Sequence, residues 1–263
     1  MYPQDKIWEK MIKEHSIAGH PVRYFQEVGS TNDIARKSAF TGAEKGTVII
    51  ADYQKKGRGR LGRSWISPPG SGLYFSLILS PALAPADLPK ITLAAGVALC
   101  RAAKSYLSNP VLKWPNDFLL KGKKAAGILT ETFFLQESGY LVILGMGINV
   151  NTPRHDFPPD IAGKITNIQE TCGKPLARGE LLEIILNQMD NLLAQAEQFG
   201  FSDILKEWRS YDAGRGKYLT WLTTEGGVIR GVSQGIDDNG LLWIRDEQGK
   251  LHEVVSGDIR YPI

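Results

Sequence analysis

The sequence predicts an α+β main domain, a mixed sheet packed with helices over residues 1–212, followed by a small all-β domain over residues 213–263. Two observations support this division. Before Gly214, segments rich in β-branched and aromatic residues alternate irregularly with amphipathic segments of helical spacing, which is typical of α+β domains. After it, short strand-like segments separated by turns predict a small antiparallel barrel of about 50 residues.

The signals for individual helices and strands follow one another along the chain. The expected helices lie at residues 7–15, from Ser30 onward, and at 87–107, 181–199 and 203–211. The expected strands lie at residues 22–27, 47–54, 73–80, 111–114, 118–120, 125–134, 140–150, 217–223, 228–234, 241–245 and 251–255. Lys121-Gly122 marks a turn, Ser30 and Asp33 suggest a capping box, and Cys100 is expected in the core.

The composition is that of an ordinary globular protein, since 43% of the 263 residues are hydrophobic and 22% are charged. No run of 18 or more apolar residues occurs, and the charged N-terminus lacks a signal-peptide core. The two cysteines, Cys100 and Cys172, have no CxxC partner and suit a reducing compartment. We therefore expect a soluble cytoplasmic protein with no membrane segment and no disulfide framework.

Positive charge is concentrated in one short segment. Residues 55–63 contain five basic side chains and no acidic one. Subtracting these five charges from the net charge of +3 leaves the rest of the chain at −2. A local positive field of this kind is expected of a site that binds one small anion, rather than of a protein that covers a polyanion.

The glycine–arginine loop GRGRLGRSW, residues 57–65, formally matches the dinucleotide-binding pattern G-x-G-x-x-G. However, no helix is expected after the loop, because residues 67–72 lead into another strand. No acidic residue lies between Asp52 and Asp87 either, so the ribose-binding acid is missing. The Rossmann interpretation therefore fails, and a P-loop fails because no G-x-x-x-x-G-K-[ST] is present.

Two interpretations of this loop remain. Arginine–glycine segments bind nucleic acids, but such segments are usually long and repetitive, whereas this one is a single burst between two strands. Glycines let backbone N–H groups approach a ligand, and guanidinium groups pair with phosphate or carboxylate oxygens. We therefore interpret the segment as a mobile anion-binding loop and keep a nucleic-acid-binding regulator as the alternative from another functional class.

Three further strings carry polar residues or glycines at strand positions. In KWPND, residues 113–117, the proline ends a strand and places Asn116 and Asp117 in a turn. In the next strand, Lys124 precedes Gly127 by three residues, so an ammonium group is expected over a ligand for which the glycine leaves room. In GMGINVN, residues 145–151, the glycines again indicate close approach of a ligand.

In this order and spacing, the strings resemble those of biotin–protein ligases, the enzymes that attach biotin to a lysine of carboxylase carrier domains. The resemblance extends from about residue 22 to the C-terminus and rests on Ser30-Thr31-Asn32, Gln54, GRGRLGRSW, KWPND, Lys124 with Gly127, and GMGINVN. It implies a catalytic biotin- and ATP-binding domain over residues 1–212 and an SH3-like barrel over residues 213–263. Gly257-Asp258-Ile259 resembles the family's end segment, and Arg260 is left without a role.

The resemblance also implies roles for individual residues. Biotin contacts are expected from Ser30, Thr31, Asn32, Gln54, Arg58, Gly59, Arg60, Lys124 and Gly127. ATP or adenylate contacts are expected from Arg58, Arg63, Trp65, Lys113, Asn116, Asp117 and Asn149. The catalytic residues are expected to be Arg60 and Lys124, which with Mg²⁺ bring the two anionic substrates together, and Asp117, which orients the attacking amine. No metal ligands are assigned.

The implied partners are biotin, ATP and a biotin carboxyl carrier protein or domain, of acetyl-CoA carboxylase or another biotin carboxylase. Within enzymes, the nearest alternative is a lipoate–protein ligase, which has a related catalytic fold and the same chemistry. The glycine–arginine loop favours biotin. The resemblance further implies a possible homodimer formed through the main-domain sheet, and no membrane partner.

Specific DNA binding is not expected. Many bacterial relatives carry an N-terminal helix-turn-helix domain, whereas 21 residues precede the first expected strand at Val22, too few for such a domain. We therefore predict that the chain makes no operator-specific complex in a gel-shift assay. A shift on a specific site that survives raised salt would contradict this prediction.

Overall fold

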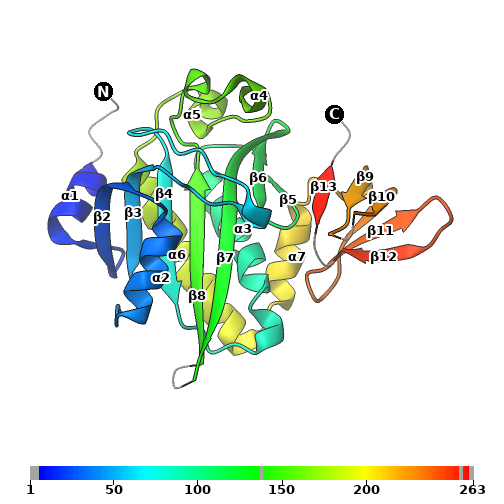
Figure 1. The fold of residues 1–263 in the computed structure, drawn as a ribbon, viewed down its shortest axis with the longest axis horizontal. Helices are drawn as coiled ribbons and strands as arrows, with labels where there is room; N and C mark the ends of the chain where they lie inside the picture. The colour runs from blue at the N-terminus through cyan, green and yellow to red at the C-terminus, as the bar shows by residue number, and fades with distance from the viewer. Residues whose placement is uncertain (1–5, 137–138, 225, 255–256, 261–263) are drawn as a thin grey trace.

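The computed structural model describes residues 6–136, 139–224, 226–254 and 257–260. The molecule is elongated: helix α1 (Lys6–Glu14) lies at one end of a large sheet and a small all-β domain lies beyond the other end (Figure 1). The predicted α+β main domain with a small β domain after it is confirmed. No helix in the described ranges is long and apolar enough to cross a membrane.

The main domain is built on an eight-stranded mixed sheet with the order β1-β2-β3-β4-β8-β7-β6-β5. Its strands are β1 (Ser16–Ile17), β2 (His20–Val28), β3 (Val48–Gln54), β4 (Leu73–Leu79), β5 (Val111–Lys113), β6 (Asp117–Leu120), β7 (Lys123–Leu135) and β8 (Gly139–Ile148). Only β2 and β3 are parallel. Every residue of β4 is buried, because this strand is central and both of its faces are covered.

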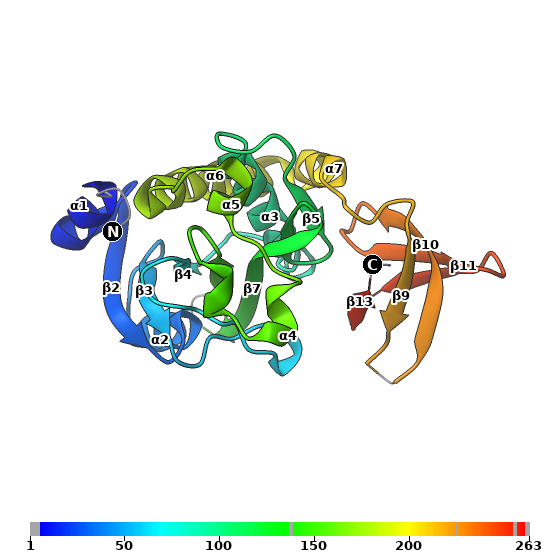
Figure 2. The same ribbon diagram turned by 90° about the horizontal axis from the view of Figure 1, so that it is seen from above.

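Helices cover the two faces unequally. The larger core joins α1, α3 (Lys90–Ala103), α6 (Arg178–Phe199) and α7 (Ser202–Ser210) to one face, and α2 (Thr31–Phe40) lies on the other (Figure 2). Alternation along β3 explains both cores, because Val48 and Ile50 face the first group whereas Ile49 packs with Ala35 of α2. The short helices α4 (Pro159–Ala162) and α5 (Ile168–Cys172) follow β8.

The small domain is one antiparallel sheet with the order β12-β11-β10-β9-β13. Its strands are β9 (Tyr218–Leu222), β10 (Val228–Ile236), β11 (Leu242–Asp246), β12 (Leu251–Val254) and β13 (Asp258–Arg260). The predicted small antiparallel domain is therefore confirmed. Within the described residues β12 and β13 are opposite edges of this sheet and do not pair, so the sheet is not a closed barrel.

Several contacts join the small domain and the chain leading to it to the main domain. The chain leaving α7 pairs with β5, since Leu112 N–H donates to the Tyr211 carbonyl and Ala213 N–H donates to the Leu112 carbonyl, both at 2.8 Å. The indole Nε1 of Trp114 donates to the Gly240 carbonyl at 3.0 Å. The small domain is thus fixed beside the KWPND segment. The change of architecture falls between α7 and β9, and the boundary at residues 212–213 stays a prediction.

Most predicted elements are present with ends shifted by a few residues. Cys100 is fully buried in α3, as predicted. The capping box is wrong: Ser30 is the N-cap of α2, but its side chain makes no capping hydrogen bond. The strands and α-helices we did not predict among the described residues are β1, β13, α4 and α5, all five residues or shorter. The expected last residue of strand 251–255, Val255, lies outside the described residues.

Candidate active site

The glycine–arginine loop folds back on itself between β3 and β4. Its backbone is closed by two hydrogen bonds, from Trp65 N–H to the Gly57 carbonyl at 2.8 Å and from Gly59 N–H to the Arg63 carbonyl at 2.7 Å. A Cβ at Gly57 would lie 2.3 Å from the Trp65 carbonyl oxygen, so only glycine permits this closure. The loop then passes in front of β8 and β7 (Figure 1).

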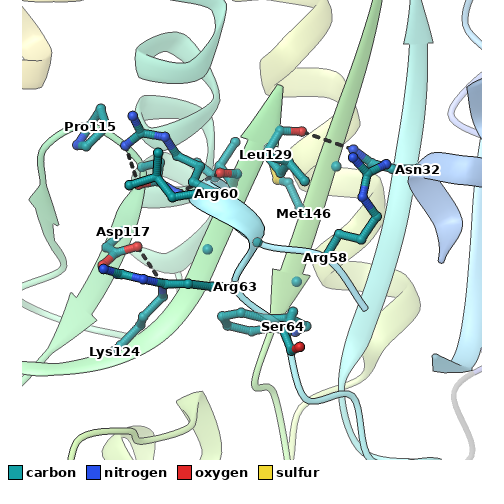
Figure 3. A pocket seen from close by; sticks show the side chains of 18 of the residues that line it. Asn32, Arg58, Arg60, Arg63, Ser64, Pro115, Asp117, Lys124, Leu129 and Met146 are labelled. Carbon is teal, nitrogen blue, oxygen red and sulfur yellow. Dashed lines mark hydrogen bonds and ion pairs between the residues drawn. The ribbon is translucent and has the colours of Figure 1, made fainter. Parts of the chain in front are cut away.

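A pocket lies between this loop, the strands β7 and β8, and the KWPND turn. The predicted site residues that line it are Ser30, Thr31, Asn32, Gln54, Arg58, Gly59, Arg60, Arg63, Trp65, Lys113, Asn116, Asp117, Lys124 and Gly127. Figure 3 shows Asn32 and Arg58 on one side of the pocket and Asp117 with Lys124 on the opposite side. The structure therefore brings together strings that are far apart in the sequence.

One predicted residue lies elsewhere. Asn149 is buried just after β8, where its Nδ2 donates to the Thr166 carbonyl at 3.1 Å, and it is not among the residues lining the pocket. Its Oδ1 is buried and has no hydrogen-bond partner in the part of the chain that the structure describes. The role of Asn149 as a nucleotide contact stays a prediction.

A buried polar network forms one end of the pocket. Gln54 Oε1 accepts from Thr31 N–H at 2.8 Å and from Thr31 Oγ1 at 3.1 Å, and Gln54 Nε2 donates to Ser67 Oγ at 2.9 Å. The Ser76 hydroxyl of β4 lies 2.8 Å from Thr31 Oγ1 and 2.6 Å from Asn32 Oδ1. Fixed donors and acceptors in a buried wall suit a small polar ring that presents both N–H and C=O groups.

Glycines of β7 and β8 leave room for the Trp65 ring to pack against these strands. Gly127 and Gly147 are direct partners in the β7–β8 pair. A Cβ at Gly147 would lie 2.4 Å from Trp65 Nε1, and one at Gly127 would lie 3.1 Å from Trp65 Cζ3. Gly145 similarly makes room for Asn32, because a Cβ there would lie 2.0 Å from Asn32 Oδ1. These glycines therefore admit side chains that line the pocket, in addition to any ligand.

We predict that Gly147→Ala destabilises the fold. The added Cβ forces the half-buried Trp65 ring to move, and overpacking of this kind costs about 1–3 kcal/mol. Urea unfolding of the purified protein would measure this loss. Gly163→Ala is the matched control, because Gly163 has no atom within 4 Å of a new Cβ and a φ of −72°. Equal unfolding free energies for the two variants would contradict the prediction.

The opposite end of the pocket is cationic. Lys124 Nζ lies 2.6 Å from Asp117 Oδ1 and 5.4 Å from the centroid of the Trp65 ring. Asp117 begins β6, paired with Lys113 across the turn at Pro115, and is not in the turn itself as we predicted. Asn116 connects this turn to the loop and to β7, because its Oδ1 accepts from Arg60 Nη1 at 3.4 Å and its Nδ2 donates to the Ile128 carbonyl at 2.8 Å.

Burial has depressed the pKa of two of these cations. Desolvation lowers the pKa of Arg60, although the nearby Asp117 charge acts in the opposite direction. Desolvation also lowers the pKa of Lys113, against the attraction of Asp117 and Asp258. Both shifts mean that nearby negative charge only partly offsets the desolvation of the two charged groups in the pocket. A bound anion would supply that compensation, so this end of the pocket is suited to carboxylate or phosphate groups.

The residues of the site region that were missed from the sequence include Ser76, Glu131 and Asp258. Ser76 lies in an apolar strand, and no local pattern marks it. Glu131 pairs with Arg58. Because Gly127, Leu129 and Glu131 are spaced two residues apart along β7, all three lie on one face of the strand, so the sequence did contain a signal for Glu131. Asp258, from the end segment, lines the pocket and pairs with Arg63 at 2.9 Å, whereas Arg260 is exposed and does not line it.

Family descriptions match both parts of the chain. Residues 24–149 match the biotin/lipoate A/B protein ligase family, and residues 221–260 match the biotin protein ligase C-terminal domain. Among curated proteins, the bifunctional ligase/repressor BirA of Bacillus subtilis is 34% identical over 244 residues, which are 92% of this chain and 74% of the relative. The biotin–[acetyl-CoA-carboxylase] ligase of Paracoccus denitrificans is 31% identical over 84% of this chain and 92% of the relative.

Solved structures agree with the sequence relatives. The biotin protein ligase of Aquifex aeolicus in complex with biotin and ATP superposes with a TM-score of 0.79 and 32% identity, covering 92% of this chain and 99% of that one. The matched region includes the pocket and both domains. The chain therefore belongs to the biotin protein ligase family.

Proposed function

We propose that this protein is an ATP-dependent ligase that converts biotin to biotinyl-5'-AMP and transfers it to a lysine of a biotin carboxyl carrier protein. The observation that carries the proposal is the two-ended pocket, in which the polar network of Thr31 and Gln54 continues into the cationic end at Arg60 and Lys124. The first end suits the ureido ring of biotin, and the second suits its carboxylate next to a phosphate.

The first step joins two anions. The biotin carboxylate oxygen attacks the α-phosphorus of ATP, the bond to the bridging oxygen breaks, and pyrophosphate leaves. Lys124 and Arg60 line the same end of the pocket and would offset both the repulsion between the reactants and the charge that develops in the transition state. Lys113 and Arg63 add positive charge on the nucleotide side, and Trp65 offers an aromatic surface there.

The second step transfers the acyl group. A carrier lysine amine attacks the carbonyl carbon of the mixed anhydride and AMP leaves, so the attacking nitrogen must lose a proton. Asp117 would orient this amine; in support, its Oδ1 lies 2.6 Å from Lys124 Nζ, the cation expected at the reacting carboxyl group. The loop over the pocket would exclude water, which otherwise hydrolyses the anhydride.

Mg²⁺ is expected to accompany ATP. Such an ion is usually bound by one or two carboxylates together with substrate phosphates and water, so a preformed cluster of protein ligands is not required. The pocket carboxylates Asp117 and Asp258 have the oxygen chemistry that the ion prefers and would hold it. When bound, it would neutralise phosphate charge.

Biotin is favoured over lipoate by the curated relatives, which are named as biotin ligases, whereas the description matching residues 24–149 covers both classes. ATP–pyrophosphate exchange distinguishes the two. We expect exchange that depends on biotin and is absent with lipoate. Exchange with lipoate and not with biotin would assign the chain to the alternative. The homodimer, the absence of operator binding and the cytoplasmic location stay predictions.

The lowered pKa of Lys113 predicts a pH dependence of ATP binding. Bound phosphate favours the charged ammonium group and so raises this pKa. The contribution of Lys113 to ATP affinity is therefore fully present at a pH below the Lys113 pKa of the free protein. As pH rises above that pKa, ATP affinity falls by up to about tenfold per pH unit. Calorimetric titration with ATP between neutral and alkaline pH would measure the decline.

Lys113→Arg provides the control for this effect, because a guanidinium group stays charged over the same range. We expect the alkaline decline in ATP affinity to shrink or disappear in this variant. An unchanged decline would contradict the assignment of this effect to Lys113.

A further inference from the structure

The guanidinium group of Arg58 is bound by two carboxylates from separate elements of the fold. Its Nη1 lies 2.8 Å from Asp33 Oδ1 in the first turn of α2, and its Nη2 lies 2.7 Å from Glu131 Oε1 on β7. Nη1 also lies 3.2 Å from Glu131 Oε2, which makes the Glu131 contact bidentate. Figure 3 shows Arg58 directed to this side of the pocket, next to Asn32.

Glu131 is itself fixed by the fold. Its Oε2 accepts from Asn32 Nδ2 at 2.8 Å, and Asn32 Nδ2 lies 3.4 Å from the Leu129 carbonyl. Asn32 in turn is buried against Gly145 and Ser76. The carboxylate that receives Arg58 is therefore held by a buried side chain of α2, and its position does not depend on the loop.

Arg58 and Arg60 differ in how their charge is compensated. Partial desolvation disfavours the charged Arg58, but the Glu131 and Asp33 contacts outweigh it and raise the Arg58 pKa. Arg60 has no carboxylate within ion-pair distance among the described residues, and burial lowers its pKa. The charge of Arg58 is thus already offset by carboxylates of the protein, whereas the charge of Arg60 is available to an incoming anion.

Backbone hydrogen bonds couple the position of Arg58 to the positions of the other loop residues. Residues 57 and 65, and residues 59 and 63, are joined by backbone hydrogen bonds on either side of the bridge between Arg58 and Ser64. Fixing Arg58 therefore fixes the base of the hairpin, residues 57–59 and 63–65, from which Arg60 at the tip extends.

We propose that Asp33 and Glu131 are positioning residues which, through Arg58, anchor the 57–65 loop over the pocket so that biotinyl-AMP is retained. This inference rests on the proposed function. Neither carboxylate lines the pocket, so both act without touching the ligand. The Arg58 guanidinium links these carboxylates to the loop, whose residues Arg58, Gly59 and Arg60 line the pocket.

The test compares Glu131→Gln, Asp33→Asn and Arg58→Gln with the wild-type protein. Glutamine at position 131 keeps an oxygen for Asn32 but removes the charge that holds Arg58. We expect the half-life of bound biotinyl-AMP, measured without carrier protein, to fall at least about fivefold in Glu131→Gln and further in Arg58→Gln. The matched control is Glu27→Gln, which removes the carboxylate that pairs with Lys55 just before the loop and should leave the half-life unchanged.

A double-mutant cycle separates anchoring from a general structural effect. If Glu131 acts through Arg58, the Arg58→Gln/Glu131→Gln protein releases the adenylate no faster than Arg58→Gln alone. Multiplication of the two single effects would overturn the proposal. An unchanged half-life in Glu131→Gln would also overturn it.

A second readout does not depend on the reaction. Trypsin cleaves after Arg60 and Arg63, and an unanchored loop opens more often, so cleavage in the unliganded Glu131→Gln protein should be faster than in the wild type and in Glu27→Gln. If the wild-type protein forms no biotinyl-AMP, the proposed function fails, whereas equal trypsin rates in all three proteins would reject the anchor itself.

Discussion

Lys124→Ala should reduce biotinyl-AMP formation at least about a hundredfold, equivalent to about 2.7 kcal/mol of transition-state stabilisation. The ammonium group lies in the cationic end of the pocket, 2.6 Å from Asp117 and near the Trp65 ring. Removing it leaves the attacking carboxylate and the α-phosphate to repel each other across a partly desolvated site. Pyrophosphate exchange in the presence of biotin measures the loss.

The adjacent Lys123 provides the matched control. It has the same side chain and lies on the same strand, but it does not line the pocket. Lys123→Ala should keep exchange close to the wild-type rate. Wild-type exchange in Lys124→Ala would refute the catalytic assignment of this residue.

Arg60→Ala should impair both formation and retention of the adenylate, again by at least about a hundredfold in the combined rate. Arg60 lacks an ion-pair partner among the described residues and lies at the tip of the closed loop, so its charge is available to phosphate. The expected signature is a lower exchange rate together with faster escape of biotinyl-AMP, which single-turnover experiments with a carrier domain would resolve.

Arg154→Ala is a suitable control for Arg60→Ala. Arg154 is an exposed arginine that pairs with Glu170 outside the pocket, so its removal changes the net charge equally without touching the site. If Arg60→Ala retains the adenylate as well as this control does, the loop arginine is not the phosphate contact.

The sequence predicts the strands and helices well where apolar periodicity is long, as in α3, α6 and β4. It fails where a tertiary contact replaces the local contact that a short pattern predicts. Ser30 looks like the partner of Asp33 in a capping box, but Asp33 instead binds Arg58, which comes from a loop 25 residues away. A local pattern carries no information about such a tertiary partner.

The candidate site was largely predictable because its glycines and cations occur in distinctive strings. What the strings could not show is which partner each residue serves. The glycines at 145 and 147 were expected to admit a ligand, yet they accommodate Asn32 and Trp65. Likewise, all loop arginines look equivalent in sequence, and only the placement of Glu131 and Asp33 separates Arg58 from Arg60.

The most direct test of the central claim is native mass spectrometry of the purified protein after incubation with biotin, ATP and Mg²⁺. The account predicts one bound biotinyl-AMP per chain, which disappears when an apo carrier domain is added and the carrier gains biotin. Absence of the adenylate, or its formation from lipoate instead of biotin, would contradict the account.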